Sequence, residues 1–353
     1  MRAGQGTFRP GAALPVIPPR EEDELISSWL DRTARFYGGS LQTLIREISC
    51  PAKPIELSAI DLGVSRTALA PIATLLGVPL EQVARHTIAA TYPWASNLVA
   101  RGLFVPDHHR MPRLRYAACP HCLEQQKAER GFSWLRRAWV FAPRTVCASH
   151  HVELQEGRAG SIVHAIWSDF LRKHAGAGQP VCDMTRSATE AVGVSSAPSR
   201  EGPIALLHQQ MAMVQDAMLA DAARGQKQRR SSASDEMAVM ASDLVWAFTR
   251  ADRYYPDRLV YEAFASDLLD SYWHMVRRRE PGPLDFTRMY LPERHTMLAT
   301  VTVLLGPDAL RSTFYRLPRD RNEDLATLHR RLRDADRAEL AERQRRWSRT
   351  DEA

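Results

Sequence analysis

Three cysteines and one histidine, arranged as two short pairs, are the residues of this sequence best suited to chemistry. Cys119 and Cys122 form a C-x2-C pair, and Cys147 with His150 forms a C-x2-H pair after 24 intervening residues. Each short turn can direct two ligands at one ion, and two such turns complete a tetrahedral Cys3His site. Pro120 stiffens the first turn, whose backbone N–H groups can donate to the thiolates. The spacing therefore predicts one structural Zn2+ bound by these four side chains.

Other interpretations of the same residues stay open. The tetrapeptide at 119–122, CPHC, is that of the active site of DsbA-type thiol–disulfide oxidoreductases, which need a thioredoxin-like fold and an oxidising compartment. Zinc deaminases combine C-x2-C with H-x-E, but here His151-Val152-Glu153 follows the cysteine pair instead of preceding it. His151 could also replace His150 as fourth ligand, although C-x2-H matches the geometry of the first pair better.

The composition is that of a mildly basic globular protein in a reducing compartment. The chain has 353 residues, of which 44% are hydrophobic and 25% charged, enough for two or three domains. A net charge of +6 permits an anionic partner such as nucleic acid but does not demand one. Three of the five cysteines fall in the cluster, so Cys50 and Cys182 are expected as thiols rather than a disulfide. No apolar run reaches the ~20 residues of a membrane span, and we expect a cytoplasmic protein.

The hydrophobic pattern predicts a mainly α-helical fold with a small zinc module in its centre. No P-loop, nucleophile elbow, H-E-x-x-H or catalytic carboxylate pattern is present, so the chain is not expected to be an enzyme. In chain order the predicted parts are a disordered lead-in at 1–14, an N-terminal helical region with a helix-turn-helix at 15–113, a zinc-ribbon or zinc-knuckle module at 114–155, and a C-terminal helical domain at 156–353 with flexible linkers near 186–203 and 224–236.

The helix-turn-helix is predicted from two helical patterns separated by a tight turn. Thr67–Leu76 and Leu80–Ala89 are the helices, and Gly77-Val78-Pro79 is the turn. The second helix of such a motif can enter a DNA groove, but an ordinary helical hairpin fits the same pattern. The candidate contacts to nucleic acid or a partner are Gln82, Arg85 and His86 on the second helix, together with Arg130, Arg136, Arg137 and Arg144, which alternate with aromatic residues in the zinc module.

The C-terminal part is predicted as a series of helices. Ile204–Ala223 is rich in methionine, Val239–Arg250 and Arg258–Arg279 follow, and Arg330–Arg349 forms one charged surface helix.

Three regions of the sequence resemble the TniQ/TnsD family of transposition target-selection proteins, and together they cover about residues 15 to 155. The resemblance is most specific around the zinc module. The residues that carry it are Glu24-Leu25, Ser28-Trp29-Leu30 and Arg32, then Leu76-Gly77-Val78 and Thr87, and finally Arg115-Tyr116, Cys119-Pro120, Cys122-Leu123, Trp134, Trp139, Val146-Cys147, His150 and Leu154.

The resemblance implies a non-catalytic adaptor with an N-terminal helix-turn-helix and a zinc module whose ligands are Cys119, Cys122, Cys147 and His150. Such proteins connect a target, either attachment-site DNA or an RNA-guided CRISPR complex, to an AAA+ ATPase that recruits the transposase. Whether the protein forms a homodimer is left open. The residue after the ligand histidine is often small in the family but is His151 here. No second cysteine cluster follows in the C-terminal half, which favours a shorter adaptor over an attachment-site reader.

Overall fold

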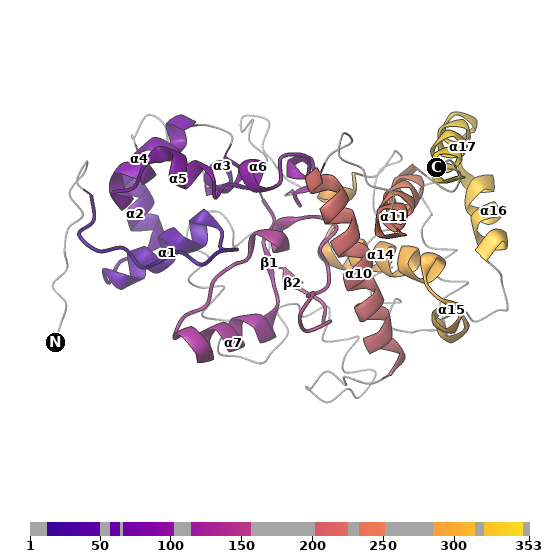
Figure 1. Cartoon of the computed structure of the whole chain (residues 1–353), viewed down its shortest axis with the longest axis horizontal. Helices are drawn as coiled ribbons and strands as arrows, with labels where there is room; N and C mark the ends of the chain where they lie inside the picture. Colours follow the sequence, from indigo (N-terminus) through magenta and orange to yellow (C-terminus); the bar gives the residue numbers. More distant parts are fainter. Residues whose placement is uncertain are drawn as a thin grey trace. The chain divides into compact units, whose positions relative to one another are not determined.

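The described parts of the computed structural model are mainly helical, with one small two-stranded sheet, which confirms the predicted fold class (Figure 1). The structure describes residues 13–49, 57–63, 66–101, 114–156, 202–224, 233–250, 285–314 and 321–348. The chain divides into two compact units. The first runs from the N-terminus to Phe141 and takes up the chain again at Gln155, whereas the second contains Ala142–Leu154 and the C-terminal helices.

The first unit is built on a set of short helices around an apolar core. Helix α1 packs against α2 and α3, and α4 packs against α2, α3 and α5. Leu30, Ile60 and Ile72 are fully buried between them. The elements of this unit are α1 (Ile26–Phe36), α2 (Leu41–Ile48), α3 (Leu57–Leu62), α4 (Arg66–Leu76), α5 (Leu80–Ala84), α6 (Ile88–Thr91), η1 (Ser96–Leu98), β1 (Ala117–Ala118), α7 (Pro120–Arg130), η2 (Arg137–Val140) and β2 (Gln155–Glu156).

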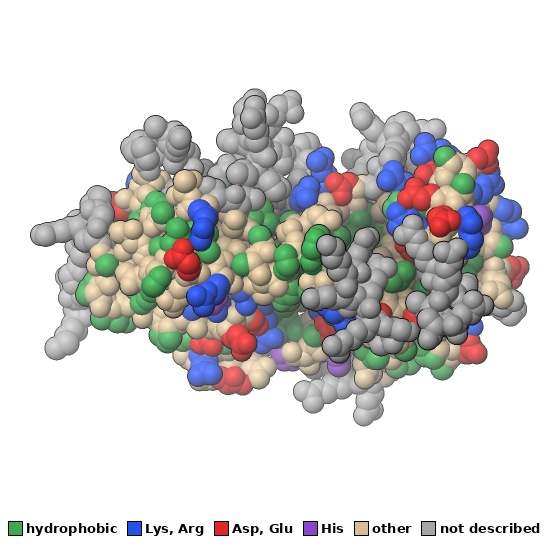
Figure 2. Space-filling view, turned by 45° about the horizontal axis from the view of Figure 1, so that its top comes forward, with side chains coloured by type: hydrophobic (Ala, Val, Ile, Leu, Met, Phe, Trp, Pro, Cys, Tyr) green, Lys and Arg blue, Asp and Glu red, His purple; other side chains and the backbone are tan. Residues whose placement is uncertain are grey.

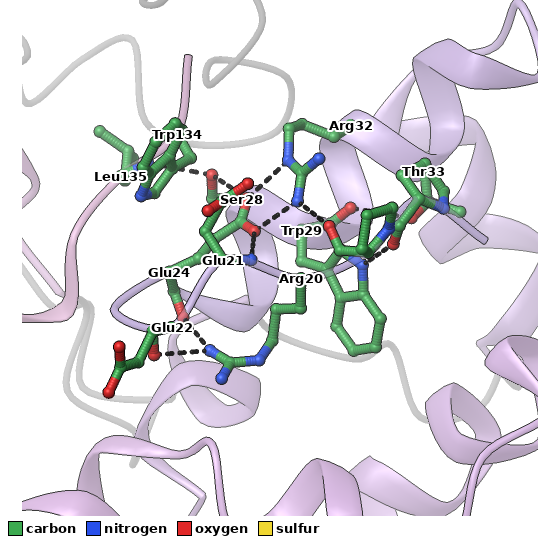
Figure 3. A network of polar contacts seen from close by, with 12 residues as sticks. Arg20, Glu21, Glu22, Glu24, Ser28, Trp29, Arg32, Thr33, Trp134 and Leu135 are labelled. Carbon is green, nitrogen blue, oxygen red and sulfur yellow. Dashed lines mark hydrogen bonds and ion pairs between the residues drawn. The ribbon is translucent and has the colours of Figure 1, made fainter. Parts of the chain in front are cut away.

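A buried ion pair ties the start of the chain to α1 (Figure 3). The carboxylate of Glu24 is fully buried, and the Nε and Nη2 atoms of Arg32 lie 2.8 and 2.6 Å from its two oxygens. Arg32 Nη2 also donates to the carbonyl of Pro19. Ser28 donates to Glu24 and accepts a hydrogen bond from the backbone N–H of Leu135 at 3.0 Å. The network therefore holds the N-terminal segment, α1 and the chain that leads into η2 together.

A second buried polar group, the carboxylate of Asp61, caps the N-terminus of α1. Leu25, at the N-cap position, provides no side-chain cap. Instead, the carboxylate of Asp61 in α3 accepts from the backbone N–H of Ser27 at 2.9 Å and from its hydroxyl at 2.6 Å. Tyr116 donates its hydroxyl to the same carboxylate at 3.1 Å. Asp61 thus caps α1 from another helix, satisfying N–H groups that have no partner within α1.

The helix-turn-helix region differs from its prediction in the second helix. Helix α4 and a turn at Gly77, whose φ of 63° is left-handed, form as predicted. The following helix, however, ends at Ala84 instead of Ala89. Thr87 is the reason, because its hydroxyl donates to the Ala84 carbonyl and accepts from the N–H of Ala90, which starts a new helix, α6. A five-residue helix is too short to present a recognition face of the usual length.

The second unit centres on long helices. Helix α10 packs against α11, α14 and α15, and α11 also packs against α14 and α17. Leu244, Phe248 and Leu298 are fully buried in this core. The elements of this unit are α10 (Pro203–Arg224), α11 (Ala233–Arg250), η6 (Phe286–Arg288), α14 (Leu291–Leu305), α15 (Asp308–Phe314), α16 (Arg321–Arg331) and α17 (Asp334–Ser348).

Three predicted segments overlap the described residues. Leu14, the last residue of the lead-in predicted at 1–14, donates its N–H to the carbonyl of Leu75 at 2.7 Å. At the ends of the linker predicted at 224–236, Arg224 is the last residue of α10 and Ala233 the first of α11, and Arg224 pairs with Asp235. The charged helix predicted at 330–349 forms as α17 but begins at Asp334, because Arg331 ends α16 and the acidic side chains of Asp334 and Asp336 favour the first turn of a helix.

Several predicted features lie outside the described residues. They are most of the lead-in (1–12), most of the linker at 186–203, the helix at 258–279, and Cys50 and Cys182. None of the described helices is long and apolar enough to cross a membrane.

Candidate metal centre

The first cysteine pair lies at the N-terminus of α7. Cys119 is the N-cap residue, Pro120 occupies the first helical turn, and Cys122 lies two positions further along. Proline suits this position because its missing N–H would have no partner there, and the N-terminal end of the helix dipole favours thiolate anions. Cys119 and Cys122 are 0% and 1% exposed. This local sequence therefore places two buried sulfur atoms at the positive end of a helix.

The second pair lies in a tight turn. The N–H of Cys147 donates to the carbonyl of Val152 at 2.8 Å, and the N–H of His151 donates to the carbonyl of Cys147 at 2.9 Å. His151 has a φ of 52°, in the left-handed region that glycine prefers, and is the only non-glycine residue with a positive φ in the described parts. A small residue would suit this position, since the chain turns back here with a positive φ.

The four predicted ligands come together. The ligand atoms of Cys119, Cys122, Cys147 and His150 all lie within 4.8 Å of one another. The Sγ of Cys147 is 3.7 Å from Nδ1 of His150, and tetrahedral zinc requires separations of roughly 3.6 to 3.8 Å between such atoms. The three cysteines form no disulfide. A buried set of three thiols and one imidazole at this spacing fits a metal ion, and it is the one such group in the described parts of the chain.

The alternatives for these residues fit less well. His151 is absent from the group of convergent ligand atoms, so His150 is the better fourth ligand. The described elements around Cys119 and Cys122 form no thioredoxin-like βαβ unit, and the only sheet there consists of β1 and β2, paired antiparallel with Ala118 opposite Gln155. The CPHC sequence is therefore better explained by the metal site than by disulfide exchange.

The seven candidate contact residues divide by burial. Gln82, Arg85 and Arg130 are exposed, while His86 and Arg136 are half-buried. Arg137 and Arg144 are buried at 8% and 5% exposure and make internal contacts. Arg137 donates to the carbonyls of Glu22 and His86 and to the hydroxyl of Thr91. Arg144 pairs with Asp216. Both guanidinium groups are therefore committed to the fold.

The surroundings of His86 are positively charged. Burial lowers the pKa of His86 to about 4, with further lowering by the guanidinium groups of Arg20, Arg137 and Arg85. The imidazole is neutral at pH 7 for this reason. Elsewhere the charges are mixed. On the face shown in Figure 2, Lys and Arg side chains lie beside Asp and Glu side chains and do not gather into one large basic field. On this face an anion contact would therefore be local.

Some residues that support the site were not found from the sequence. Gln215 of α10 bonds to the backbone just before Cys147, and His208 of α10 bonds to the carbonyl of His151 just after His150. Burial and the neighbouring His295 lower the pKa of His208 to about 4. The only signal in the sequence is the presence of polar residues within a helix otherwise rich in alanine, leucine and methionine. Polar residues at such positions are equally typical of a solvated face, so their role depends on the tertiary fold.

The sequence matches the TniQ family over residues 15–154, a range that ends just after the second ligand pair. Residues 15–154 are a TniQ domain. The matched family takes part in transposition, and its members are generally non-catalytic. No curated protein and no solved structure matches the chain. The helices from α10 onward lie outside the TniQ domain.

Proposed function

We propose that this protein is a non-catalytic target-selection adaptor in DNA transposition. It would link target DNA or an RNA-guided complex to an AAA+ ATPase that recruits the transposase. The observation that carries the proposal is the TniQ match over residues 15–154, which includes both pairs of the Cys3His cluster. The exposed side chains of Gln82, Arg85 and Arg130 are the candidate contacts of this adaptor.

We further propose that the cluster holds one structural Zn2+. Three thiolates and the Nδ1 atom of His150 would fill all four tetrahedral positions, which leaves no open position for a substrate. When bound, the ion would fix the two ligand turns in one arrangement, and the chain's own residues would keep it from water because the cysteines are buried. A reducing compartment such as the cytoplasm suits a site that needs three free thiols.

Metal content tests the zinc site directly. Protein purified without added metal should contain about one zinc per chain, and a chelator should make three additional thiols reactive. Cys119→Ser should lower the zinc content, whereas His121→Ser, a half-exposed residue of the same turn, should not. Protein without zinc, with a readily reduced Cys119–Cys122 disulfide, would instead favour the oxidoreductase interpretation.

Association with the ATPase tests the adaptor role. Wild-type protein and His121→Ser should bind the AAA+ ATPase of the same transposition system saturably, for example in biolayer interferometry. Cys119→Ser should lose this binding because the module that presents the contacts loses its metal. Absence of binding by zinc-loaded wild-type protein would argue against the adaptor role while leaving the metal site intact.

A DNA-binding regulator is the second candidate, favoured by the positive surroundings of His86. It predicts affinity for duplex DNA that weakens steeply with salt, since each phosphate contact contributes about one to the slope of log K against log salt. Arg85→Ala should reduce that slope by about one. Arg288→Ala, an exposed arginine outside the TniQ domain, is the matched control. A wild-type protein that binds no DNA between 50 and 200 mM salt, roughly the range over which such contacts are measured, excludes this candidate.

A further inference from the structure

Helix α10 holds the chain that leads into the second ligand pair. Gln215 is 0% exposed, and its side-chain oxygen accepts from the backbone N–H groups of Thr145 and Val146 at 3.0 and 3.1 Å. Its amide nitrogen donates to the hydroxyl of Thr145 at 2.8 Å. One side chain therefore satisfies three polar groups immediately before Cys147. Because these groups are buried, an apolar residue in place of Gln215 would leave them without partners.

The same helix also holds the far side of the ligand turn. His208 lies seven residues before Gln215, about two helical turns, and its Nδ1 is 3.1 Å from the carbonyl oxygen of His151. A carbonyl only accepts, so the imidazole is the donor. His151 has the unfavourable φ of 52° that closes the turn after His150. The bond from His208 thus holds the strained residue that follows the fourth ligand.

A third contact lies beside the first. Asp216, the neighbour of Gln215, pairs with the buried guanidinium group of Arg144. The three contacts from α10 therefore reach the chain on both sides of Cys147 and His150, at residues 144, 145–146 and 151.

We propose that α10 positions the Cys147–His150 half of the metal centre, so that metal affinity depends on a helix outside the TniQ domain. The inference rests on the Cys3His centre described above. Binding a metal includes the cost of ordering its ligands, and a backbone already held in place reduces that cost. Substitution of residues that orient metal ligands typically lowers the metal affinity by about 10- to 100-fold. Gln215 and His208 are positioning residues in this sense.

Zinc competition against a chromophoric chelator, with the folded full-length chain, measures the effect. Gln215→Leu keeps the side-chain size and removes the hydrogen bonds, and we expect its zinc Kd to rise at least about 10-fold. Its Co2+ complex should also have weaker or shifted absorption bands, because the tetrahedral geometry is less well fixed. Gln209→Leu, an exposed glutamine on the same helix, should leave both the zinc Kd and the Co2+ spectrum unchanged.

Two further variants separate local positioning from general loss of stability. Leu219→Ala removes a buried apolar side chain from α10 but keeps the side chains of His208, Gln215 and Asp216, so it should lower the melting temperature but not the zinc affinity. His208→Phe keeps an aromatic ring against His295, 5.2 Å away between centroids, and loses only the bond to His151. It should weaken zinc binding, and it provides the test even if Gln215→Leu does not fold.

The outcomes distinguish this inference from the metal centre itself. Wild-type protein that binds neither Zn2+ nor Co2+ overturns both. Wild-type protein that binds zinc, with Gln215→Leu or His208→Phe at wild-type affinity, overturns the positioning role alone. A loss of affinity in Leu219→Ala as large as that in Gln215→Leu also overturns it, because the effect would then follow from stability and not from the hydrogen bonds.

Discussion

The capping carboxylate of Asp61 should make the stability of the first unit depend on pH in an unusual direction. Asp61 is 1% exposed, and burial raises its pKa from 3.8 to about 6, although hydrogen bonds from Ser27 and Tyr116 oppose the shift. A raised pKa means that the folded state binds the proton more tightly than the unfolded chain. Protonation of Asp61 therefore contributes to the free energy of unfolding in full at pH values below the unfolded pKa of 3.8. This contribution is lost as the pH rises through the folded pKa of about 6.

The size of the effect follows from the two pKa values. The difference between 3.8 and about 6, at about 1.4 kcal/mol for each pH unit, corresponds to about 3 kcal/mol. Most of this change falls between pH 4 and 7. Most surface carboxylates have little difference between folded and unfolded pKa, so a comparison of two chains that differ only at residue 61 isolates the contribution.

Asp61→Asn is the comparison to make. Its amide oxygen can still accept from the N–H of Ser27 and its NH2 group can donate to the hydroxyl of Tyr116, so the cap is kept without the charge. The free energy of unfolding in urea, followed by tryptophan fluorescence, should rise in the variant relative to wild type by about 2 to 3 kcal/mol from pH 4 to pH 7. Zinc release at low pH affects both chains and cancels.

Glu81→Gln is the control for this experiment, because Glu81 is exposed and forms a surface pair with Arg66. Its difference from wild type should change by less than about 0.5 kcal/mol over the same range. If the difference between Asp61→Asn and wild type is the same at pH 4 and pH 7, the ionised carboxylate carries no burial cost and the reasoning is refuted.

Three further substitutions test the fold. Arg32→Met leaves the carboxylate of Glu24 buried without its cation, so the free energy of unfolding in urea should fall by about 3 to 5 kcal/mol; a loss below 1 kcal/mol would contradict the role of this pair. Gly63→Ala places a methyl group 2.5 Å from the side chain of Thr87 at a φ of +75°, so the free energy of unfolding should fall by about 2 kcal/mol or more. Gly38→Ala, at a similar φ but with open space around it, should lower the free energy of unfolding by about 1 kcal/mol. His151→Gly should raise the melting temperature of the zinc-loaded protein by relieving about 1 kcal/mol of backbone strain, and a lower melting temperature would show that His151 is not strained.

The features that were predicted correctly from the sequence are those that depend on residues close together in the chain. The metal ligands could be found because two short turns with fixed spacing are sufficient to define such a site. Helices α1, α2 and α4 follow from apolar periodicity, and the turn at Gly77 follows from glycine's freedom at positive φ. Each of these features depends on residues within a few positions of one another.

Features that depend on distant residues could not be predicted. Asp61 caps α1 from 34 residues away, and Gln215 reaches Thr145 across 70 residues. Arg137 and Arg144 carry the same charge as Arg130, and only the tertiary contacts decide that two of them are buried. The break at Thr87 within an otherwise helical pattern was missed because a threonine inside a helix and a threonine that caps one have the same sequence signal.

The residues that carry the TniQ resemblance in the N-terminal region are mostly buried. The residues that determine the fold are therefore different from the residues that can contact a partner. Glu24, Ser28 and Arg32 form the buried network of Figure 3. Side chains without water access cannot touch a partner, so these residues specify how the domain folds and not what it binds. Contacts must come from exposed residues such as Arg85 and Arg130, which are not part of the resemblance. Under the proposed adaptor function, two TniQ domains could share these internal residues and still select different targets. Substitutions at exposed positions would then change target choice while metal content and stability stay the same.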